Sequence, residues 1–299
     1  MEVVLSLPRG FCAGVVRAIE VVDLCLDKFG PPVYVKHEIV HNPYVVASLE
    51  RKGAITVEDV DDIPSGSVVV FSAHGSPPED FQNAEARGLR VIDATCPLVT
   101  RVHNEARKYQ REGRKIVLVG HRGHQEVRGT MGQADMGLMD EQEGMNLPDW
   151  DRDTPVAVLT QTTLSVDDTR EAVEEIKRNF PDAITRADIC YATTNRQVAA
   201  KELARTVDLV LVIGAQNSSN CNRLREVAEG QGVPAYLING PEDLDEKWLN
   251  GVNRVGITSG ASTPEVLVDE VIQALRPDEV TSMAGIEENV SFVLPKELR

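Results

Sequence analysis

The chain alternates between short runs of β-branched residues and longer segments in which apolar residues recur at helical spacing. Each short run is typical of a strand, ends in a polar loop, and is usually followed by an amphipathic helix. The six clearest runs are residues 3–7, 68–71, 116–119, 156–160, 209–213 and 254–258. Because strands that alternate with helices form parallel sheets with helical cover, the pattern predicts an α/β protein.

Several helix starts can be recognised from their capping residues. A serine or threonine N-cap, or a proline at the first helical position, stands just before apolar residues at helical spacing. The clearest starts are Ser165 with Asp168, Thr263 with Pro264, and Cys96 with Pro97. We expect a helix to begin at each of these points.

The six strand–helix units pair in chain order into three small α/β domains with parallel sheets. The predicted boundaries are 1–97, 98–192 and 193–278, and the tail 279–299 is expected to pack back on the first domain. Residues 289–295 are typical of one last strand within that tail. Ligands bind beyond the C-terminal ends of parallel strands, so the polar loops of three domains could contribute to one site.

Composition and charge narrow the function classes. The 299 residues are 42% hydrophobic and 26% charged, which is typical of a globular protein rather than a disordered one. The formal net charge of −16 argues against a broad nucleic-acid-binding face. It does not exclude a local pocket for a small anion at helix N-termini.

Nothing in the sequence predicts export or membrane insertion. The longest apolar stretch, at 209–215, is far shorter than the ~20 residues that span a bilayer. Five widely spaced cysteines do not resemble a secreted disulfide framework. We therefore expect a cytoplasmic protein with no membrane contact.

Two motifs imitate known sites. Residues 37–41 read H-E-x-x-H, but a zinc protease needs this motif on a helix, and here it follows a predicted strand and precedes a helix start at Asn42-Pro43. A zinc hydrolase using His37 and His41 is therefore the weaker alternative; His41 remains a candidate ligand-binding residue and His37 is interpreted as incidental. Residues 230–235 imitate a dinucleotide fingerprint but precede a strand instead of following one.

Three histidines and three cysteines occupy comparable positions. His41, His74 and His124 each follow a predicted strand, which favours an anion or metal site over three unrelated structural roles. The three cysteines each stand just before a helix, about one per domain, where a helix N-terminus would stabilise a thiolate: Cys12, Cys96 and Cys190. Three separate buried thiols are the alternative, and no C-x-x-C pair is present. Cys25 is interpreted as core, and Cys221 is given no role.

Further polar groups stand at helix starts. The clusters at 217–220 and 262–263 combine hydroxyl and amide side chains with free backbone N–H groups, which suits a phosphate; helix capping alone would also explain them. Glu126 lies in a glycine-containing loop and could move protons, although an exposed loop acid is the commoner outcome.

Taken together, these motifs resemble the 4-hydroxy-3-methylbut-2-enyl diphosphate reductase (IspH/LytB) family. The resemblance extends from residue 8 to the C-terminal VLPKELR and rests on many blocks in order. They are PRGFCAGV (8–15), VHN (40–42), SAHG (72–75), DATCPLV (93–99), GHRGHQE (120–126), GTMGQ (129–133), TQTTLS (160–165), DICYATTNRQ (188–197) and NSSN (217–220).

The resemblance implies a trefoil of three α/β domains around a central iron–sulfur site. Cys12, Cys96 and Cys190 would hold three irons of one 4Fe–4S cluster, and the fourth iron would be open to the substrate's hydroxyl oxygen. The implied reaction is the two-electron, two-proton reductive dehydroxylation of an allylic alcohol diphosphate. Its products would be isopentenyl and dimethylallyl diphosphate, in the last step of the methylerythritol phosphate pathway.

The resemblance also implies roles for individual residues. The diphosphate would be bound by His41, His74, Ser218, Ser219, Asn220 and Ser262, and His124 would lie along the substrate. Glu126, with Thr162 completing a hydrogen-bond relay, would protonate the leaving hydroxyl. Electrons would come from a ferredoxin or flavodoxin, whose docking surface the sequence does not locate. A non-catalytic iron–sulfur sensor is the second alternative.

Overall fold

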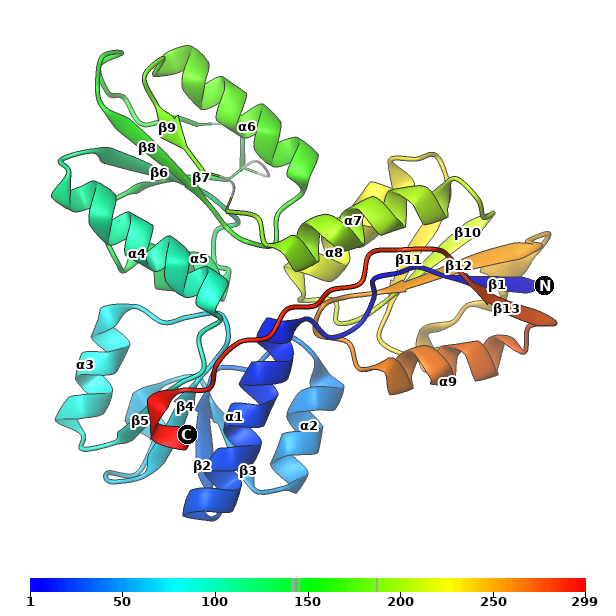
Figure 1. Ribbon diagram of the computed structural model, residues 1–299, viewed down its shortest axis with the longest axis horizontal. Helices are drawn as coiled ribbons and strands as arrows, with labels where there is room; N and C mark the ends of the chain where they lie inside the picture. The colour runs from blue at the N-terminus through cyan, green and yellow to red at the C-terminus, as the bar shows by residue number, and fades with distance from the viewer. Residues whose placement is uncertain (141–142, 145, 187) are drawn as a thin grey trace. The chain divides into compact units, whose positions relative to one another are not determined.

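The computed structural model describes residues 1–140, 143–144, 146–186 and 188–299. It contains three sheets whose strand pairings are all parallel (Figure 1). The chain divides into two compact units. The first unit comprises Met1–Val15, His41–Val45 and Tyr191–Ser291, and the second comprises Val16–Val40, Val46–Cys190 and Phe292–Arg299. The α/β prediction is confirmed.

The first unit contains a five-stranded sheet in the order β11-β10-β12-β1-β13. Its strands are β1 (Glu2–Leu5), β10 (Leu209–Ile213), β11 (Ala235–Ile238), β12 (Arg254–Ser259) and β13 (Glu279–Ser282), and its helices are α7 (Tyr191–Ala204), α8 (Ser219–Glu229) and α9 (Glu265–Leu275). Leu211 faces the α9 side with Val268, whereas Val210 and Val212 face the α7 and α8 side. This period of two buries both faces of the strand, as a parallel sheet requires.

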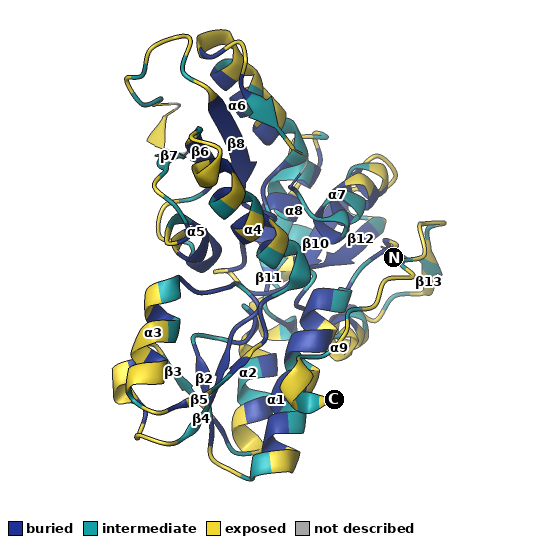
Figure 2. Cartoon of the chain, turned by 60° about the vertical axis from the view of Figure 1, so that its left-hand side comes forward, coloured by how far each residue is buried: buried dark blue, intermediate teal, exposed yellow. Residues whose placement is uncertain are grey.

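The second unit begins with a four-stranded sheet in the order β3-β2-β4-β5. Its strands are β2 (Val33–Lys36), β3 (Ala54–Val57), β4 (Val68–Phe71) and β5 (Arg90–Asp93), and the helices beside it are α1 (Ala13–Phe29), α2 (Pro43–Arg51) and α3 (Pro78–Ala86). Phe71 and Val69 of β4 pack with Ala84 of α3. Figures 1 and 2 both show α1 on the side of the sheet away from α3.

The other sheet of the second unit has the order β7-β6-β8-β9. Its strands are β6 (Lys115–Val119), β7 (Gly137–Met139), β8 (Val156–Thr160) and β9 (Ile184–Thr185), with helices α4 (Pro97–Arg111), α5 (Gln125–Met131) and α6 (Val166–Asn179). Leu118 packs with Val102 of α4, and Val117 packs with Ile176 of α6. The two helices therefore cover opposite faces, and Figure 2 shows the buried strand β8 with the exposed outer side of α6.

Sheet membership corrects the predicted domain organisation. The strand at the start of the predicted domain 1–97 does not join β4; β1 pairs with β12 and β13. The predicted strand at 289–295 is wrong, because within the described chain the strand of the tail is β13, and Val293 is 68% exposed. The end of the tail does pack on the predicted first domain, where Arg17 Nε donates to the Val293 carbonyl at 2.8 Å.

The predicted helix starts are correct to within one residue. Ser165 is the N-cap of α6 and accepts from the Asp168 N–H, and Cys96 is the N-cap of α4. The predicted N-cap Thr263 is one residue early, because Pro264 occupies that position and the Thr263 hydroxyl donates to the Ile213 carbonyl at 2.9 Å. In the described part of the chain, no helix is both long and apolar enough to cross a membrane.

Candidate functional site

The predicted site residues divide between the two units. The first unit holds Cys12, His41, Ser218, Ser219, Asn220 and Ser262, and the second holds His74, Cys96, His124, Glu126, Thr162 and Cys190. All of them follow a strand or open a helix, because parallel strands end in the loops that start the next helix.

The loop that carries Cys12 is held by the end of β12. The Cys12 N–H donates to the Ala261 carbonyl at 3.1 Å, and the Gly10 N–H donates to Ser259 Oγ at 2.9 Å. Gly10 has φ of +70°, a backbone conformation that side-chain-bearing residues rarely adopt. Cys12 is partly exposed and is not in a disulfide.

A buried arginine that the sequence analysis did not identify supports the same loop. Arg196 of α7 is fully buried, and its guanidinium donates to the Gly10 carbonyl at 2.8 Å. It also pairs with Glu288 at 3.0 Å, which compensates the buried charge. Tyr191 Oη accepts a hydrogen bond from the Ala13 N–H at 3.2 Å, and burial raises the pKa of Tyr191 to about 12. The neutral phenol and the ion pair fix the Cys12 loop against α7.

The polar cluster of the first unit gathers at the start of α8. Ser218 is the N-cap and accepts from the Cys221 N–H, while Ser219 and Asn220 form the buried first turn. Both polar atoms of the Asn220 side chain are buried without a hydrogen-bond partner among the described residues. A buried amide in this state is costly, and beside the free N–H groups of a helix start it favours an anionic ligand.

His41 and Ser262 meet within the first unit. Ser262 Oγ donates to the His41 carbonyl at 3.0 Å, and Asn42 caps α2 by accepting from the Val45 N–H at 3.2 Å. The H-E-x-x-H segment therefore precedes the helix as predicted, and its histidines do not share a helical face.

Cys221 has a packing role. A Cβ added to Gly214 or Gly260 would lie 2.3 or 2.2 Å from Cys221 Sγ, so these glycines allow two strand-end loops to approach the thiol closely. Burial raises the pKa of Cys221 to about 11, and burial also raises that of Cys25 to about 11. Both remain neutral thiols, as expected for core positions.

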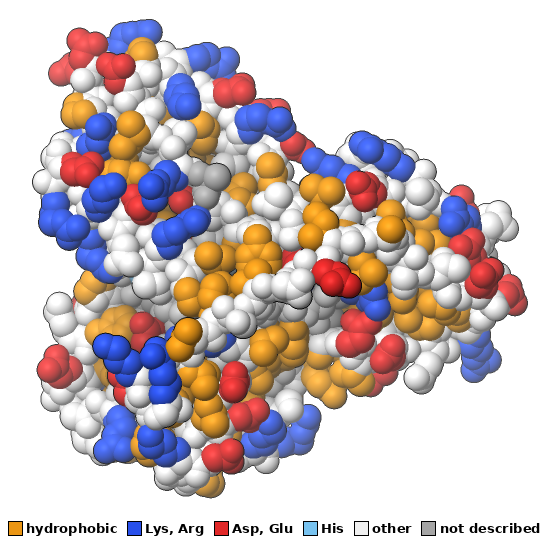
Figure 3. All heavy atoms as spheres, in the orientation of Figure 1, with side chains coloured by type: hydrophobic (Ala, Val, Ile, Leu, Met, Phe, Trp, Pro, Cys, Tyr) orange, Lys and Arg blue, Asp and Glu red, His pale blue; other side chains and the backbone are white. Residues whose placement is uncertain are grey.

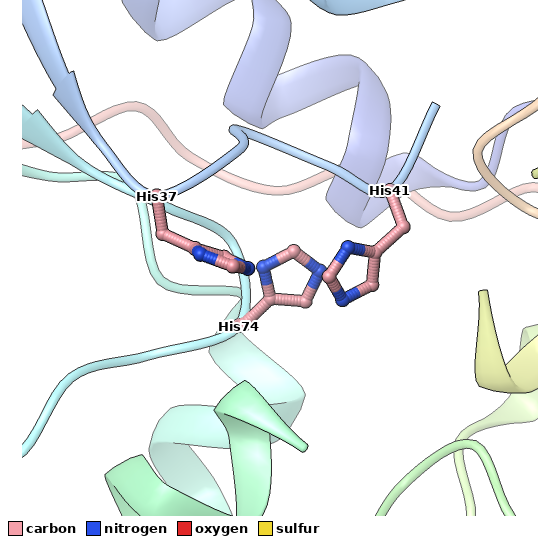
Figure 4. Close-up of side chains that lie close together, drawn as sticks. All are labelled: His37, His41 and His74. Carbon is pink, nitrogen blue, oxygen red and sulfur yellow. The ribbon is translucent and has the colours of Figure 1, made fainter. Parts of the chain in front are cut away.

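In the second unit, His74 lies in contact with two other imidazoles. Its ring centroid is 5.6 Å from that of His37 and 6.1 Å from that of His124, and both pairs are edge to face. Figure 4 shows the His37 and His74 rings together. His37 Nδ1 lies 2.9 Å from Glu58 Oε2, and His37 has φ of +61°, which is uncommon outside glycine. His37 therefore lies beside a predicted site residue, which its interpretation as incidental did not anticipate.

His103, in contrast, is a histidine in the protein interior. It is buried within α4, and burial lowers its pKa to about 4. Its Cε1 lies 2.7 Å from the position of a Cβ on Gly75, which has φ of +82°. His103 is therefore a neutral packing residue.

Glu126 is held inside the second unit and is not an exposed loop acid. It is the second residue of α5, is 3% exposed, and accepts from the Thr162 N–H at 2.6 Å and from Thr162 Oγ1 at 2.9 Å. Burial raises its pKa to about 7, although both Thr162 hydrogen bonds oppose the shift. The Glu126 N–H donates to His124 Nδ1 at 3.1 Å, so a neutral His124 carries its proton on Nε2.

Thr162 links Glu126 to the Cys190 segment. Its N–H and hydroxyl both donate hydrogen bonds to the Glu126 carboxyl, and its carbonyl accepts a hydrogen bond from the Cys190 N–H at 3.1 Å. Asp188, two residues before Cys190, is 1% exposed and lies 3.7 Å from Arg101. Burial raises the pKa of Asp188 to about 6, while Arg101 opposes the shift. The sequence analysis did not identify Asp188, because no local pattern shows that it is buried.

Cys96 is the third cysteine at a helix start, and it is not in a disulfide. Its N–H donates to the Ala73 carbonyl at 3.0 Å, which places the residue beside the His74 loop. The buried Arg17 guanidinium donates to the Ala94 and Thr95 carbonyls, both at 3.1 Å, just before Cys96. A partly exposed cysteine at a helix N-terminus is a suitable donor for a soft metal centre, and Cys12, Cys96 and Cys190 all stand in such positions.

A profile described as LytB protein matches residues 3–276. The chain is 54% identical to 4-hydroxy-3-methylbut-2-enyl diphosphate reductase 1 of Rhodopseudomonas palustris, covering 98% of both chains. It is 51% identical to the Pseudomonas aeruginosa protein named 4-hydroxy-3-methylbut-2-enyl diphosphate reductase, covering 100% of this chain and 99% of that one.

Solved structures agree with the fold. The Plasmodium falciparum structure entitled E-1-hydroxy-2-methyl-but-2-enyl-4-diphosphate reductase is 39% identical and has a TM-score of 0.94, covering 100% of this chain and 96% of that one. A second structure, entitled (E)-4-hydroxy-3-methyl-but-2-enyl diphosphate reductase, the terminal enzyme of the non-mevalonate pathway, is 34% identical with a TM-score of 0.65, covering 92% and 99%. The resemblance seen in the sequence is thereby confirmed, and the chain belongs to the LytB protein family.

Proposed function

We propose that the chain is an iron–sulfur reductase that converts 4-hydroxy-3-methylbut-2-enyl diphosphate to isopentenyl diphosphate and dimethylallyl diphosphate. The allylic C–O bond breaks and a C–H bond forms, with the uptake of two electrons and two protons. One proton leaves with the hydroxyl oxygen as water, and the other is added to carbon. The observation that carries the proposal is the buried Glu126 carboxyl on Thr162, in a family whose named full-length relatives catalyse this step.

The cofactor assignment is that Cys12, Cys96 and Cys190 together hold one 4Fe–4S cluster. Support comes from the chemistry of the donors: each is a partly exposed cysteine outside any disulfide, just before a helix, whereas Cys25 and Cys221 are buried. When bound, such a cluster supplies single electrons and an iron with no protein ligand. Three thiolates that share one cluster must all be deprotonated, which a helix N-terminus favours.

The diphosphate is assigned to the hydroxyl, amide and imidazole groups at the strand ends. Ser218, Ser219, Asn220 and Ser262 contribute from the first unit, together with His41, and His74 and His124 contribute from the second. The unpartnered amide of Asn220 supports this assignment, because a phosphate oxygen would accept hydrogen bonds from its N–H groups. The neutral His124 tautomer leaves an Nε2–H donor for the substrate.

Glu126 is assigned as the proton donor to the leaving hydroxyl. A pKa of about 7 keeps a large fraction of the carboxyl protonated near neutral pH, and a general acid works best when its pKa lies near the working pH. Thr162 holds both carboxyl oxygens, so the proton is presented from a fixed position. A closed, dry site would protect the reduced allylic intermediate from stray protons.

Anaerobic turnover tests the proposed function. Purified protein is incubated with 4-hydroxy-3-methylbut-2-enyl diphosphate and dithionite-reduced methyl viologen, and both products are measured. We expect both isopentenyl and dimethylallyl diphosphate, and a brown protein with about four irons per chain. Tightly bound zinc without a chromophore would favour the hydrolase alternative, and a cluster without turnover would favour the sensor.

A further inference from the structure

Helix α4 differs in charge from every other described helix of this acidic chain. Within Pro97–Arg111 it carries four basic residues and one acidic residue, although the whole chain has a formal net charge of −16. Each other α-helix has at most one more basic than acidic residue, and several are acidic. A basic helix on so acidic a chain needs an explanation beyond solubility.

The basic side chains form a stripe on the exposed side of α4. Arg101, Lys108 and Arg111 recur at intervals that place them on one side of a helix, and Arg186 lies beside them through its 2.7 Å ion pair with Glu105. We call these four residues the α4 face. All four are exposed, and Figure 3 shows Lys and Arg side chains gathered where Figure 1 places α4.

The acidic residues on this stripe only partly offset the positive charge. Glu105 has a side chain that is 12% exposed, whereas the side chain of Glu112, just beyond the end of α4, is 43% exposed. Lys108 Nζ lies 3.9 Å from a carboxylate oxygen of each, which is a weak contact at a solvated surface. Four cations therefore stand against three carboxylates, two of which, Glu105 and the Asp188 that pairs with Arg101, are largely covered.

The opposite helix of the same sheet provides the contrast. Helix α6 covers the other face of the sheet and carries five acidic and three basic residues. Its basic residues include Lys177 and Arg178, which are exposed like those of α4. Both helices lie in the second unit and carry exposed basic side chains, so the feature that distinguishes them is the balance of basic and acidic residues.

The α4 face lies beside both cysteine-bearing segments of the second unit. Cys96 is the N-cap of α4, so Arg101 follows it by little more than one helical turn. Arg101 also lies 3.7 Å from Asp188, two residues before Cys190. A partner that binds over Arg101 therefore docks next to two of the three proposed ligands of the cluster.

We propose that the α4 face is the docking surface for an acidic one-electron carrier protein of the ferredoxin or flavodoxin type. Two proteins with large negative charges repel each other, so productive encounter requires a local patch of opposite sign. Arg101, Lys108, Arg111 and Arg186 supply it beside the segments of Cys96 and Cys190. This inference rests on the proposed reductase function, since it assigns the surface through which the electrons for that reaction arrive.

Two charge-reversal pairs on the intact protein test the proposal. Lys108→Glu with Arg111→Glu alters the α4 face, and Lys177→Glu with Arg178→Glu makes the same change on α6. Each protein, loaded with its cluster, is assayed at low ionic strength with reduced acidic ferredoxin and separately with reduced methyl viologen, which needs no docking surface. We expect the α4 pair to lose roughly tenfold or more in kcat/KM for ferredoxin, the range typical of electrostatic steering. Its methyl viologen rate should stay within about twofold of the unaltered protein, and the α6 pair should keep both rates.

The outcomes separate this inference from the proposed function. Absence of methyl viologen turnover in the unaltered protein overturns the function itself. Normal methyl viologen turnover with equal ferredoxin rates in both pairs overturns the docking surface alone. The neutral pair Lys108→Gln with Arg111→Gln, which adds no carboxylate beside Glu105 and Glu112, covers the case in which the reversed pair does not fold. It should show the same loss to a smaller degree, and unchanged ferredoxin kinetics in this pair would also contradict the proposal.

Discussion

Cysteine and histidine each occur in two settings in this protein, and the settings differ in what the side chain can do. Cys12, Cys96 and Cys190 stand at helix starts and are partly exposed. Cys25 and Cys221 are buried, and their raised pKa of about 11 keeps them neutral. The same residue type is therefore a proposed metal donor in one setting and a small apolar side chain in the other.

The histidines repeat the contrast within the second unit. His74 and His124 lie in strand-end loops with their rings in contact, while His103 is enclosed by its own helix and Gly75. Burial lowers the pKa of His103 to about 4, so it does not titrate near neutral pH. Within one residue type, the position along the strand–loop–helix unit therefore distinguishes the proposed site residues from the packing residues.

Loss of a thiol at a helix start is the change with the largest expected effect. We predict that Cys96→Ser in anaerobically purified protein reduces iron from about four per chain to less than half of that, and abolishes turnover, because an alcohol is a poor ligand for a soft metal centre. Iron and sulfide analysis with the visible spectrum measures this. Full iron content in Cys96→Ser would remove Cys96 from the proposed ligand set.

Replacement of Glu126 separates proton delivery from metal binding. We predict that Glu126→Gln keeps the cluster and its spectrum but lowers turnover with methyl viologen by roughly 10²–10⁴-fold, the usual contribution of a general acid. The amide preserves the shape of the carboxyl and removes its acidic proton. Turnover at the native rate would show that another group protonates the leaving hydroxyl.

The pH profile sharpens the same assignment. Since burial raises the pKa of Glu126 to about 7, the carboxyl is protonated below that pH and loses its proton above it. A group that acts as an acid then makes turnover fall as the pH rises through about 7. We expect this fall in turnover in the anaerobic pH–rate profile of the unaltered protein. The residual turnover of Glu126→Gln should not show it. A rate that rises through this range would assign Glu126 the role of a base.

The smallest effect is expected from the interior cysteine. We predict that Cys25→Ala retains iron content and turnover and loses about 1 kcal/mol of stability through the cavity left in the core. Thermal unfolding and iron analysis on the same preparation provide the measurement. Iron loss in Cys25→Ala that matched Cys96→Ser would erase the distinction between the two settings.

Local patterns were sufficient to predict six of the strands, β1, β4, β6, β8, β10 and β12, and three helix starts to within one residue. The runs 68–71 and 209–213 coincide with β4 and β10, and Cys96 caps α4 as its Cys-Pro sequence indicates. Sheet partnership was not local: β1 joins β12, some 250 residues away, because nothing in a strand's own sequence specifies its neighbour.

Burial of charged groups was likewise hidden in the sequence. Glu126 stands between glycine-containing segments that suggest an exposed loop, yet the fold encloses it against Thr162. Asp188 and Arg196 are buried by contacts with segments distant in sequence, Arg101 in one case and the Gly10 loop in the other. Such contacts depend on tertiary structure, so the residues appear only once the chain is folded.

Thiol protection tests most directly whether three separated cysteines hold one cluster. The anaerobic iron-loaded protein and the iron-free protein are each treated with an alkylating reagent, and the modified cysteines are identified by mass spectrometry. We predict that Cys12, Cys96 and Cys190 are protected together in the loaded protein and modified together after iron removal, while Cys25 and Cys221 resist modification in both. Full iron content in a loaded protein with any one of the first three alkylated would contradict a shared cluster.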